Sequence, residues 1–336
     1  MEKAGEFLKM LYALLAGSLS LVLEVSLQHF WIGTQSRFRV TQAQKSYGVG
    51  IDTEIKAATP AMGGLVFIGM ALLFFSADCL LTDRGGESAL FWALPAACGG
   101  VGFLDDWLKF RRGSSEGLAS LQKLAAQFLA VSLWTVWFFW RNEFSLCLWP
   151  GFSCPPPAAV PLTVLAVVGM VNAVNVTDGL DGLAGGAFMI SLGVLGYILP
   201  LSRSGPLLSA FAVLFGMTGG FLFHNVRPAR TFMGDAGSHF LGGALAALCV
   251  QGGAAAALLP AGFLFGIELL SSAVQIAAIR GFGRKVFRMA PLHHHFQRLG
   301  WDETAVTSRF LIFHALGAAF LAALFAEFLP GPPPGP

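Results

Sequence analysis

The sequence predicts an all-α, polytopic integral membrane protein. Of its 336 residues, 55% are hydrophobic and only 12% are charged, whereas soluble domains carry about 25% charged residues. Most of the chain lies in continuous apolar runs of about 20 residues, the length that crosses a bilayer core as a helix. A β-barrel would instead show short alternating segments. The net charge of +2 is too small to indicate a nucleic-acid partner.

Ten of the apolar runs are expected to span the membrane. They occupy residues 8–31, 60–81, 89–105, 118–140, 159–176, 183–201, 206–225, 237–258, 260–279 and 306–328. The first run has no clear small-residue cleavage site, so we interpret it as a span and not as a removed signal peptide. We expect residues 1–336 to form a single transmembrane domain, with a disordered, proline-rich tail at 330–336.

The basic residues predict how the chain is oriented in the membrane. Of the 21 Lys and Arg residues, all but Lys3, Lys9, Arg84, Arg141 and Arg203 lie in or beside one set of alternate loops. The positive-inside rule assigns that set to the cytoplasm and both termini to the extracytoplasmic side. The polar clusters described below all fall on the cytoplasmic side, which predicts an active-site cleft there. Clusters divided between the two faces would have favoured a transport pathway.

Two adjacent acids, Asp105 and Asp106, are expected at the C-terminal end of the third span. Such a pair opposes the helix dipole and is self-repelling, although Lys109 and the following arginines offset part of that cost. The pair is either an ordinary interfacial helix end or a functional group that binds a metal or acts as a base. We favour the functional interpretation.

The segment from residue 172 to 181 is the densest polar cluster. Asn172, Asn175 and Asp178 follow a spacing of three residues, so they share one helix face at the membrane edge. Gly179 then breaks the helix and allows backbone N–H groups to approach a ligand. Together with Asp181, these side chains offer the oxygen ligands that Mg²⁺ prefers. A glycine-rich turn with capping acids would account for an aspartate, but not for both asparagines.

Asp235 and Phe232 precede the eighth span. Asp235 alone could cap that helix. Beside the 172–181 segment it supplies a further oxygen ligand, and Phe232 supplies a ring able to stack on a base. The two residues therefore extend the predicted site.

The largest cytoplasmic loop contains His293, His294 and His295. Three consecutive histidines on one helix cannot all face one metal, but protonated histidines bind phosphate and relay protons near neutral pH. The alternative is a solvated polar loop. We favour a role for these histidines in the site.

Four other ionisable residues are ambiguous. Lys56, just before Thr59, and Lys123 lie at the cytoplasmic interface, where each either reaches lipid headgroups or contacts a diphosphate. Glu24 and Glu268 fall within spans, where acids are costly and usually face the bundle interior. The sequence assigns neither glutamate a role.

These motifs resemble those of the polyprenyl-phosphate N-acetylhexosamine-1-phosphate transferase superfamily. The Asp-Asp pair, the Asn-x-x-Asn-x-x-Asp-Gly-x-Asp segment and Gly234-Asp235 are shared across that superfamily. Three further motifs are specific to its phospho-N-acetylmuramoyl-pentapeptide transferase branch: Thr59-Pro-x-Met-Gly-Gly, Arg288-Met-Ala-Pro-Leu-His-His-His-Phe and Gly300-Trp301. The chain departs from the branch at Gly48–Glu54, where a Gly-Pro-x-x-His stretch is usual, and at Ala61, where Thr is usual.

The resemblance implies a transferase domain with ten transmembrane helices, commonly a homodimer, in the bacterial cytoplasmic membrane. It implies Mg²⁺-dependent transfer of phospho-MurNAc-pentapeptide from UDP-MurNAc-pentapeptide to undecaprenyl phosphate. The products are lipid I and UMP, in the first membrane step of peptidoglycan synthesis. One alternative is a sister enzyme that transfers GlcNAc-1-phosphate to the same lipid. A proton-coupled transporter or lipid flippase is a distant alternative, because only Glu24 and Glu268 are candidates for charges near the membrane midplane and no obvious repeat relates the two halves.

The expected mechanism assigns roles to the clustered residues. Asp235 would hold Mg²⁺ with Asn175 nearby, and Asp105 would be the base for the lipid phosphate, with Asp106 as its electrostatic neighbour. Lys123 and His294 would contact phosphates. The remaining expected substrate-binding residues are Lys56, Thr59, Asn172, Asp178, Gly179, Asp181, Phe232, His293 and His295. Direct attack by the lipid phosphate and a phospho-enzyme on a carboxylate both remain open.

Overall fold

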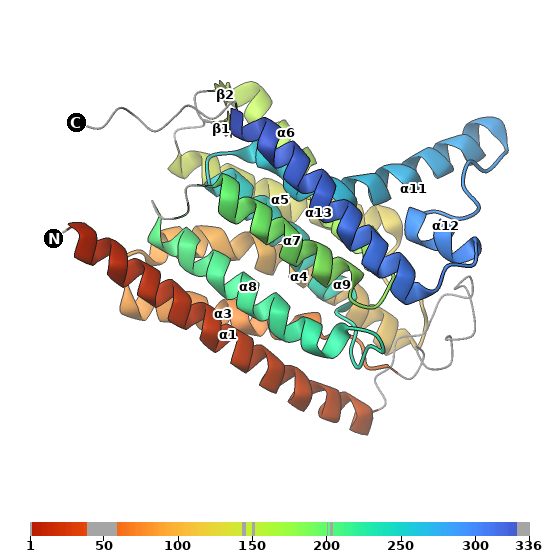
Figure 1. The fold of residues 1–336 in the computed structure, drawn as a ribbon, viewed down its shortest axis with the longest axis horizontal. Helices are drawn as coiled ribbons and strands as arrows, with labels where there is room; N and C mark the ends of the chain where they lie inside the picture. Colours follow the sequence, from red (N-terminus) through yellow and green to blue (C-terminus); the bar gives the residue numbers. More distant parts are fainter. Residues whose placement is uncertain are drawn as a thin grey trace.

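A bundle of roughly aligned helices makes up most of the computed structural model, which describes residues 2–38, 59–142, 146–149, 152–199, 201 and 204–327 (Figure 1). The helices are α1 (Glu2–Phe38), α3 (Gly64–Leu81), α4 (Gly85–Arg112), α5 (Ser120–Arg141), α6 (Pro156–Thr177), α7 (Leu183–Ile198), α8 (Gly205–Asn225), α9 (Gly234–Gln251), α10 (Leu258–Ala261), α11 (Phe263–Phe282), α12 (Leu292–Arg298) and α13 (Glu303–Glu327), with a 3₁₀ turn at Ala255–Ala257. Lys56, the divergent 48–54 stretch and the 330–336 tail lie outside the described residues.

Each of the ten predicted spans coincides with a helix. Within the described ranges, eight helices are long and apolar enough to cross a membrane. The other two predicted spans correspond to α7, with 16 residues, and to α9. The protein therefore belongs to the helical, multi-pass membrane class that the sequence predicted.

A short antiparallel hairpin was not predicted. Strands β1 (Leu146–Trp149) and β2 (Phe152–Cys154) pair within the loop between α5 and α6. The sequence analysis had assigned no regular structure to that loop.

The third predicted span ends later than expected. The prediction placed its end at Asp105, but α4 continues to Arg112, where Gly113 adopts a left-handed conformation and donates its N–H to the carbonyls of Lys109 and Phe110. Asp105 therefore lies about two turns inside the helix, and the argument from the helix C-terminus was wrong. The basic residues of the last turn are favourable at a helix C-terminus and allow α4 to extend past the acids.

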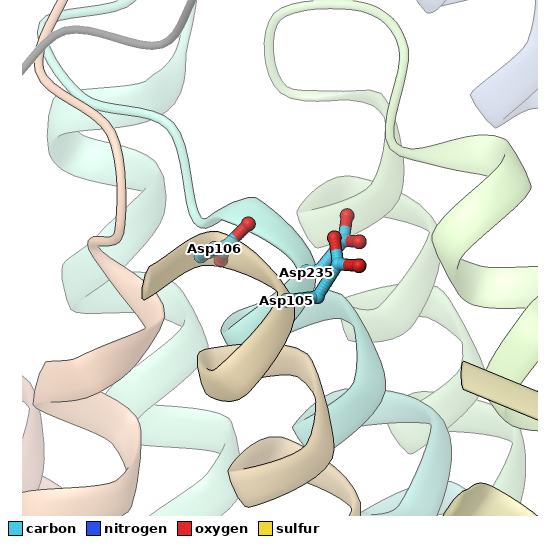
Figure 2. Close-up of side chains that lie close together, drawn as sticks. All are labelled: Asp105, Asp106 and Asp235. Carbon is cyan, nitrogen blue, oxygen red and sulfur yellow. The ribbon is translucent and has the colours of Figure 1, made fainter. Parts of the chain in front are cut away.

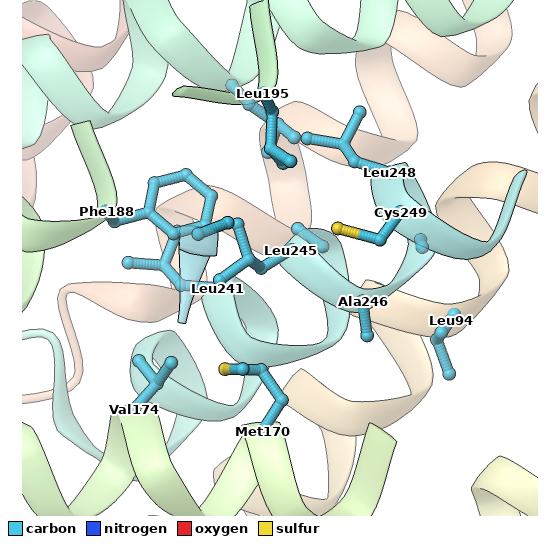
Figure 3. Packing of buried hydrophobic residues seen from close by; sticks show 14 of the residues in the cluster. Leu94, Met170, Val174, Phe188, Leu195, Leu241, Leu245, Ala246, Leu248 and Cys249 are labelled. Atoms are coloured by element: carbon cyan, nitrogen blue, oxygen red, sulfur yellow. The ribbon is translucent and has the colours of Figure 1, made fainter. Parts of the chain in front are cut away.

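Helix α9 occupies the centre of the bundle. Its apolar half, including Leu241, Leu245 and Leu248, is fully buried, and Figure 3 shows it packed among side chains such as Phe188 of α7 and Met170 of α6. Because the neighbouring helices cover α9 on its sides, this helix does not need a lipid-facing apolar surface. Its first turn carries Asp235.

Helices α4 and α9 touch through their backbones near that first turn. A Cβ placed on Gly102 of α4 would overlap the carbonyl oxygen of Asp235. Glycine is therefore required at position 102 for the close approach, and this contact fixes the distance between the acids of α4 and the acid of α9.

A polar face of α1 holds the chain that enters α3. Gln28 Nε2 donates to Glu24 Oε1 at 2.9 Å and to the Gly63 carbonyl at 2.8 Å, and Gln35 Nε2 donates to the Ala61 carbonyl. The buried Glu24 thus has a structural partner within the bundle, as expected for an acid inside a span.

Replacement of Gly102 by alanine is expected to lower the thermal stability of the purified protein. The added methyl group meets rigid backbone, and overpacking of this kind typically costs about 1–3 kcal/mol. Gly100→Ala is the matched control on the same helix, because a Cβ there has nothing within 4 Å. A melting temperature for Gly102→Ala equal to that of the control would contradict the proposed close approach.

Candidate active site

Three carboxylates meet where α4 contacts the start of α9. One oxygen each from Asp105, Asp106 and Asp235 lies within 4.8 Å of the others. Figure 2 shows Asp105 and Asp235 side by side, with Asp106 on another side of the same turn of α4. The Asp235 side chain is 14% exposed, whereas that of Asp105 is 1% exposed, so Asp235 is the more accessible to a solute cation.

Two lysines lie among these carboxylates. Lys109 Nζ is 2.6 Å from Asp105 Oδ2, 3.4 Å from Asp106 Oδ1 and 3.1 Å from Asp235 Oδ2. Lys123 Nζ is 3.1 Å from Asp105 Oδ2 and 2.5 Å from Asp235 Oδ2. Lys123 was expected here from the sequence, whereas Lys109 was expected only to offset the charge of the acids. Its spacing of three and four residues from the two acids would have indicated the contact.

The lysines set the charge state of Asp235. Burial alone would raise the pKa of this carboxyl group, but the ammonium groups of Lys109 and Lys123 hold the pKa well below its ordinary value. Asp235 is therefore ionised at neutral pH and available to bind a cation.

Backbone groups fix the orientation of the two acids of α4. Ala236 N, in the first turn of α9, donates to Asp106 Oδ2 at 3.0 Å. Leu118 N, in the loop before α5, donates to Asp105 Oδ1 at 2.8 Å. These hydrogen bonds restrict the rotation of the two carboxylates.

The two asparagines of α6 have different partners. Asn175 Nδ2 donates to Asp235 Oδ1 at 3.0 Å and to Ser238 Oγ at 2.9 Å, so it orients the metal-ligand candidate. Asn172 Nδ2 lies 2.8 Å from Gln127 Oε1, not from a carboxylate of the cluster. Gln127 Nε2 in turn lies 3.3 Å from His239 Nε2. The sequence analysis did not identify Gln127 or Ser238, since neither belongs to a dense motif.

The turn after α6 is held to other parts of the chain. Asp178 is the C-cap residue of α6, and its N–H donates to the Val174 carbonyl. Asp181 is buried; its Oδ2 accepts from Ala229 N at 3.1 Å, and its N–H donates to Glu303 Oε1. The acid in this turn thus joins the loop after α8 to the start of α13.

The three histidines of α12 contact three different groups. His293 is fully buried, with Nδ1 3.2 Å from Glu268 Oε2. His294 Nδ1 is 2.8 Å from Gln297 Oε1, and His295 Nδ1 accepts from Arg288 N at 3.0 Å.

Thr59 and Phe232 lie on two segments that pair through their backbones. Phe232 N donates to the Pro60 carbonyl at 2.9 Å, and Gly63 N donates to the Phe232 carbonyl at 2.8 Å. Thr59 is buried and Phe232 is half-buried. This pairing brings the Thr-Pro motif next to the residues that precede α9, whose first turn carries Asp235.

The donor set suits a hard divalent cation. Asp105, Asp106 and Asp235 supply carboxylate oxygens only, and oxygen ligands of this kind are preferred by Mg²⁺, which also keeps waters and phosphate oxygens in its coordination shell. Lys109 and Lys123 place two ammonium groups beside these oxygens, and such groups bind phosphate. The arrangement therefore fits a site that binds both a cation and phosphate groups.

Comparison with known proteins identifies the family. The family model described as glycosyl transferase family 4 matches residues 88–253, a range that contains all three acids of the cluster. The phospho-N-acetylmuramoyl-pentapeptide-transferase of Nostoc sp. (strain PCC 7120 / SAG 25.82 / UTEX 2576) is 38% identical over 281 residues, which cover 80% of this chain and 75% of that relative.

Other bacteria have relatives of similar identity. The protein of the same name from Kosmotoga olearia is 37% identical over 278 residues, covering 82% of this chain and 86% of the relative. The one from Pelotomaculum thermopropionicum is 38% identical, covering 80% and 86%. These matches confirm the resemblance seen in the motifs, and the chain belongs to the phospho-N-acetylmuramoyl-pentapeptide-transferase family.

Proposed function

We propose that the protein transfers phospho-MurNAc-pentapeptide from UDP-MurNAc-pentapeptide to undecaprenyl phosphate, forming lipid I and UMP. The observation that carries the proposal is the cluster of three carboxylates and two lysines at one end of the membrane bundle. A reaction between a soluble nucleotide and a lipid-anchored phosphate requires charge compensation at such an interface. The relatives' shared name supports the choice of sugar.

We further propose that the chain has ten spans, both termini outside, and an active-site cleft facing the cytoplasm of a bacterial cell. The excess of basic residues in the loops around the cluster supports this orientation in the cytoplasmic membrane. We propose a single transferase domain over residues 1–336 that assembles as a homodimer, as the resemblance to the family implies.

The cation of the proposed site is Mg²⁺, held by Asp235 with Asp105 and Asp106 nearby. Asn175 would keep the Asp235 carboxylate oriented through its 3.0 Å hydrogen bond. Bound there, Mg²⁺ would supply charge stabilisation for the diphosphate and for the departing UMP.

The two lysines would contact phosphate oxygens. Their ammonium groups already lie among the carboxylates. A diphosphate that enters the site can therefore replace a carboxylate as the partner of a lysine. His294 of α12 would contact a further phosphate oxygen. These groups position the reactants, which is the main contribution of a protein to phosphoryl transfer.

Bond formation would involve one oxygen of the lipid phosphate. Asp105 would accept the proton of that oxygen when it is protonated, and Asp106 would stabilise the arrangement electrostatically. The oxygen then bonds to the phosphorus attached to the sugar, and the bond from that phosphorus to the bridging oxygen breaks to release UMP. The nucleoside end of the substrate would contact Lys56, Asp178, Gly179, Asp181 and Phe232. The other expected substrate-binding residues, Thr59, Asn172, His293 and His295, would support these contacts.

The first test measures UMP release from UDP-MurNAc-pentapeptide and undecaprenyl phosphate. Release is expected to require Mg²⁺, to stop with EDTA, and to fall by at least about 100-fold in Asp235→Asn, because several kcal/mol of charge stabilisation are lost. Asp78→Asn is the matched control: it is a buried helix acid whose partners are Tyr12 and Ser88, remote from the cluster. Activity with UDP-GlcNAc in place of the pentapeptide nucleotide would contradict the proposed sugar specificity.

A second test distinguishes the two chemical routes, and direct attack is the one that we propose. It predicts no exchange of labelled UMP into UDP-MurNAc-pentapeptide by enzyme freed of lipid phosphate, since the acceptor is the only nucleophile. Readdition of undecaprenyl phosphate serves as the control for active enzyme. Robust exchange without lipid would instead indicate a phospho-enzyme on Asp105 or Asp235.

A further inference from the structure

Glu268 is a fully buried acid in the second turn of α11 and is not part of the acidic cluster. An ionisable side chain inside a membrane span is costly and is usually retained for a function. Both of its carboxylate oxygens contact the same residue: Oε1 accepts from His293 N at 3.2 Å, and Oε2 lies 3.2 Å from His293 Nδ1. The carboxylate thus holds the backbone and the ring of one histidine.

The same face of α11 holds the rest of the preceding loop. Gln275, two turns further along, donates from Nε2 to the Phe287 carbonyl at 2.9 Å and accepts from Val286 N and Phe287 N. Glu268 and Gln275 therefore hold the loop at residues 286–287 and the start of α12 against α11 (Figure 1).

The carboxylate also determines the tautomer of His293. A carboxylate oxygen accepts hydrogen bonds, so the contact with Oε2 places a hydrogen on Nδ1, and in that tautomer Nε2 is an acceptor. Nε2 is buried and has no hydrogen-bond partner among the residues that the structure describes. It faces Gly179 so closely that a Cβ at that position would overlap it. On the other side, the His294 ring centroid is 4.2 Å from that of His293.

We propose that Glu268 is a positioning residue that acts through His293. It fixes the tautomer of His293 and thereby the spacing between the histidines of α12 and the turn at Gly179. This inference rests on the proposed function, in which that turn lies on the nucleotide side of the site. It predicts that Glu268 affects use of the nucleotide substrate and not of the lipid.

Glu268→Gln tests the proposal without changing the size of the side chain. The amide oxygen can still accept from His293 N, but the amide nitrogen donates to Nδ1, which moves the ring hydrogen to Nε2. We expect kcat/KM for UDP-MurNAc-pentapeptide to fall about 10- to 100-fold, mainly through KM, with the KM for undecaprenyl phosphate unchanged. Ser271→Ala is the control, since Ser271 is a buried neighbour that donates only to the Glu268 carbonyl. An unchanged nucleotide KM in Glu268→Gln would overturn the proposal.

A double-mutant cycle separates positioning from a general structural effect. In a His293→Asn background, Glu268→Gln is expected to cause no further loss, because its effect passes through the missing ring. Fully additive losses would overturn the proposal. If Glu268→Gln does not fold, Gly179→Ala provides the second variant, and it is expected to raise the same nucleotide KM by displacing the His293 ring. A normal nucleotide KM in Gly179→Ala would likewise overturn the proposal.

A spectroscopic measurement tests the inference independently of activity. In protein labelled with ¹⁵N-histidine, the resonances missing from His293→Asn identify this ring. We expect hydrogen on Nδ1 in the natural chain and on Nε2 in Glu268→Gln; the same tautomer in both would overturn the proposal. A natural chain that is inactive but shows this switch would refute the proposed function alone.

Discussion

Compensation of charge between three carboxylates and two lysines, at the backbone contact of α4 and α9, is the interaction on which the site depends. Three acids this close cannot all remain ionised in a largely buried location without cations among them. Lys109 comes from the same helix as two of the acids, and Lys123 comes from α5, so the ion pairs also tie three helices together.

The sequence predicted the helical membrane class and the neighbourhood of Asp105, Asp106, Asn175 and Asp235. It could do so because the charged loops indicated which ends of the apolar runs lie on one side. It misplaced the end of α4, since hydropathy falls at the first charges whereas the helix continues until Gly113. Hydropathy reports contact with lipid, and backbone hydrogen bonding is a separate property that persists beyond the bilayer.

Contacts between distant segments could not be predicted in the same way. Glu268 and His293 are separated by a loop whose path depends on Gln275, and no periodic pattern encodes that path. Gln28 likewise contacts Gly63 only because α1 packs beside the start of α3. Such buried polar side chains carry a weak sequence signal, a polar residue within an apolar run, which indicates an internal partner without naming it.

The pairing of residues 59–64 with the start of α9 is made largely by the main chain. Gln35 likewise binds the carbonyl of Ala61 and not its side chain. Every amino acid supplies a carbonyl, so this contact is indifferent to the identity of residue 61. The presence of alanine, where the family usually has threonine, is therefore compatible with an intact segment. Mutational tolerance at position 61 should follow the hydrogen bonds of the backbone, whereas Gly64 should tolerate no side chain, because a Cβ there would overlap the backbone of Gly237.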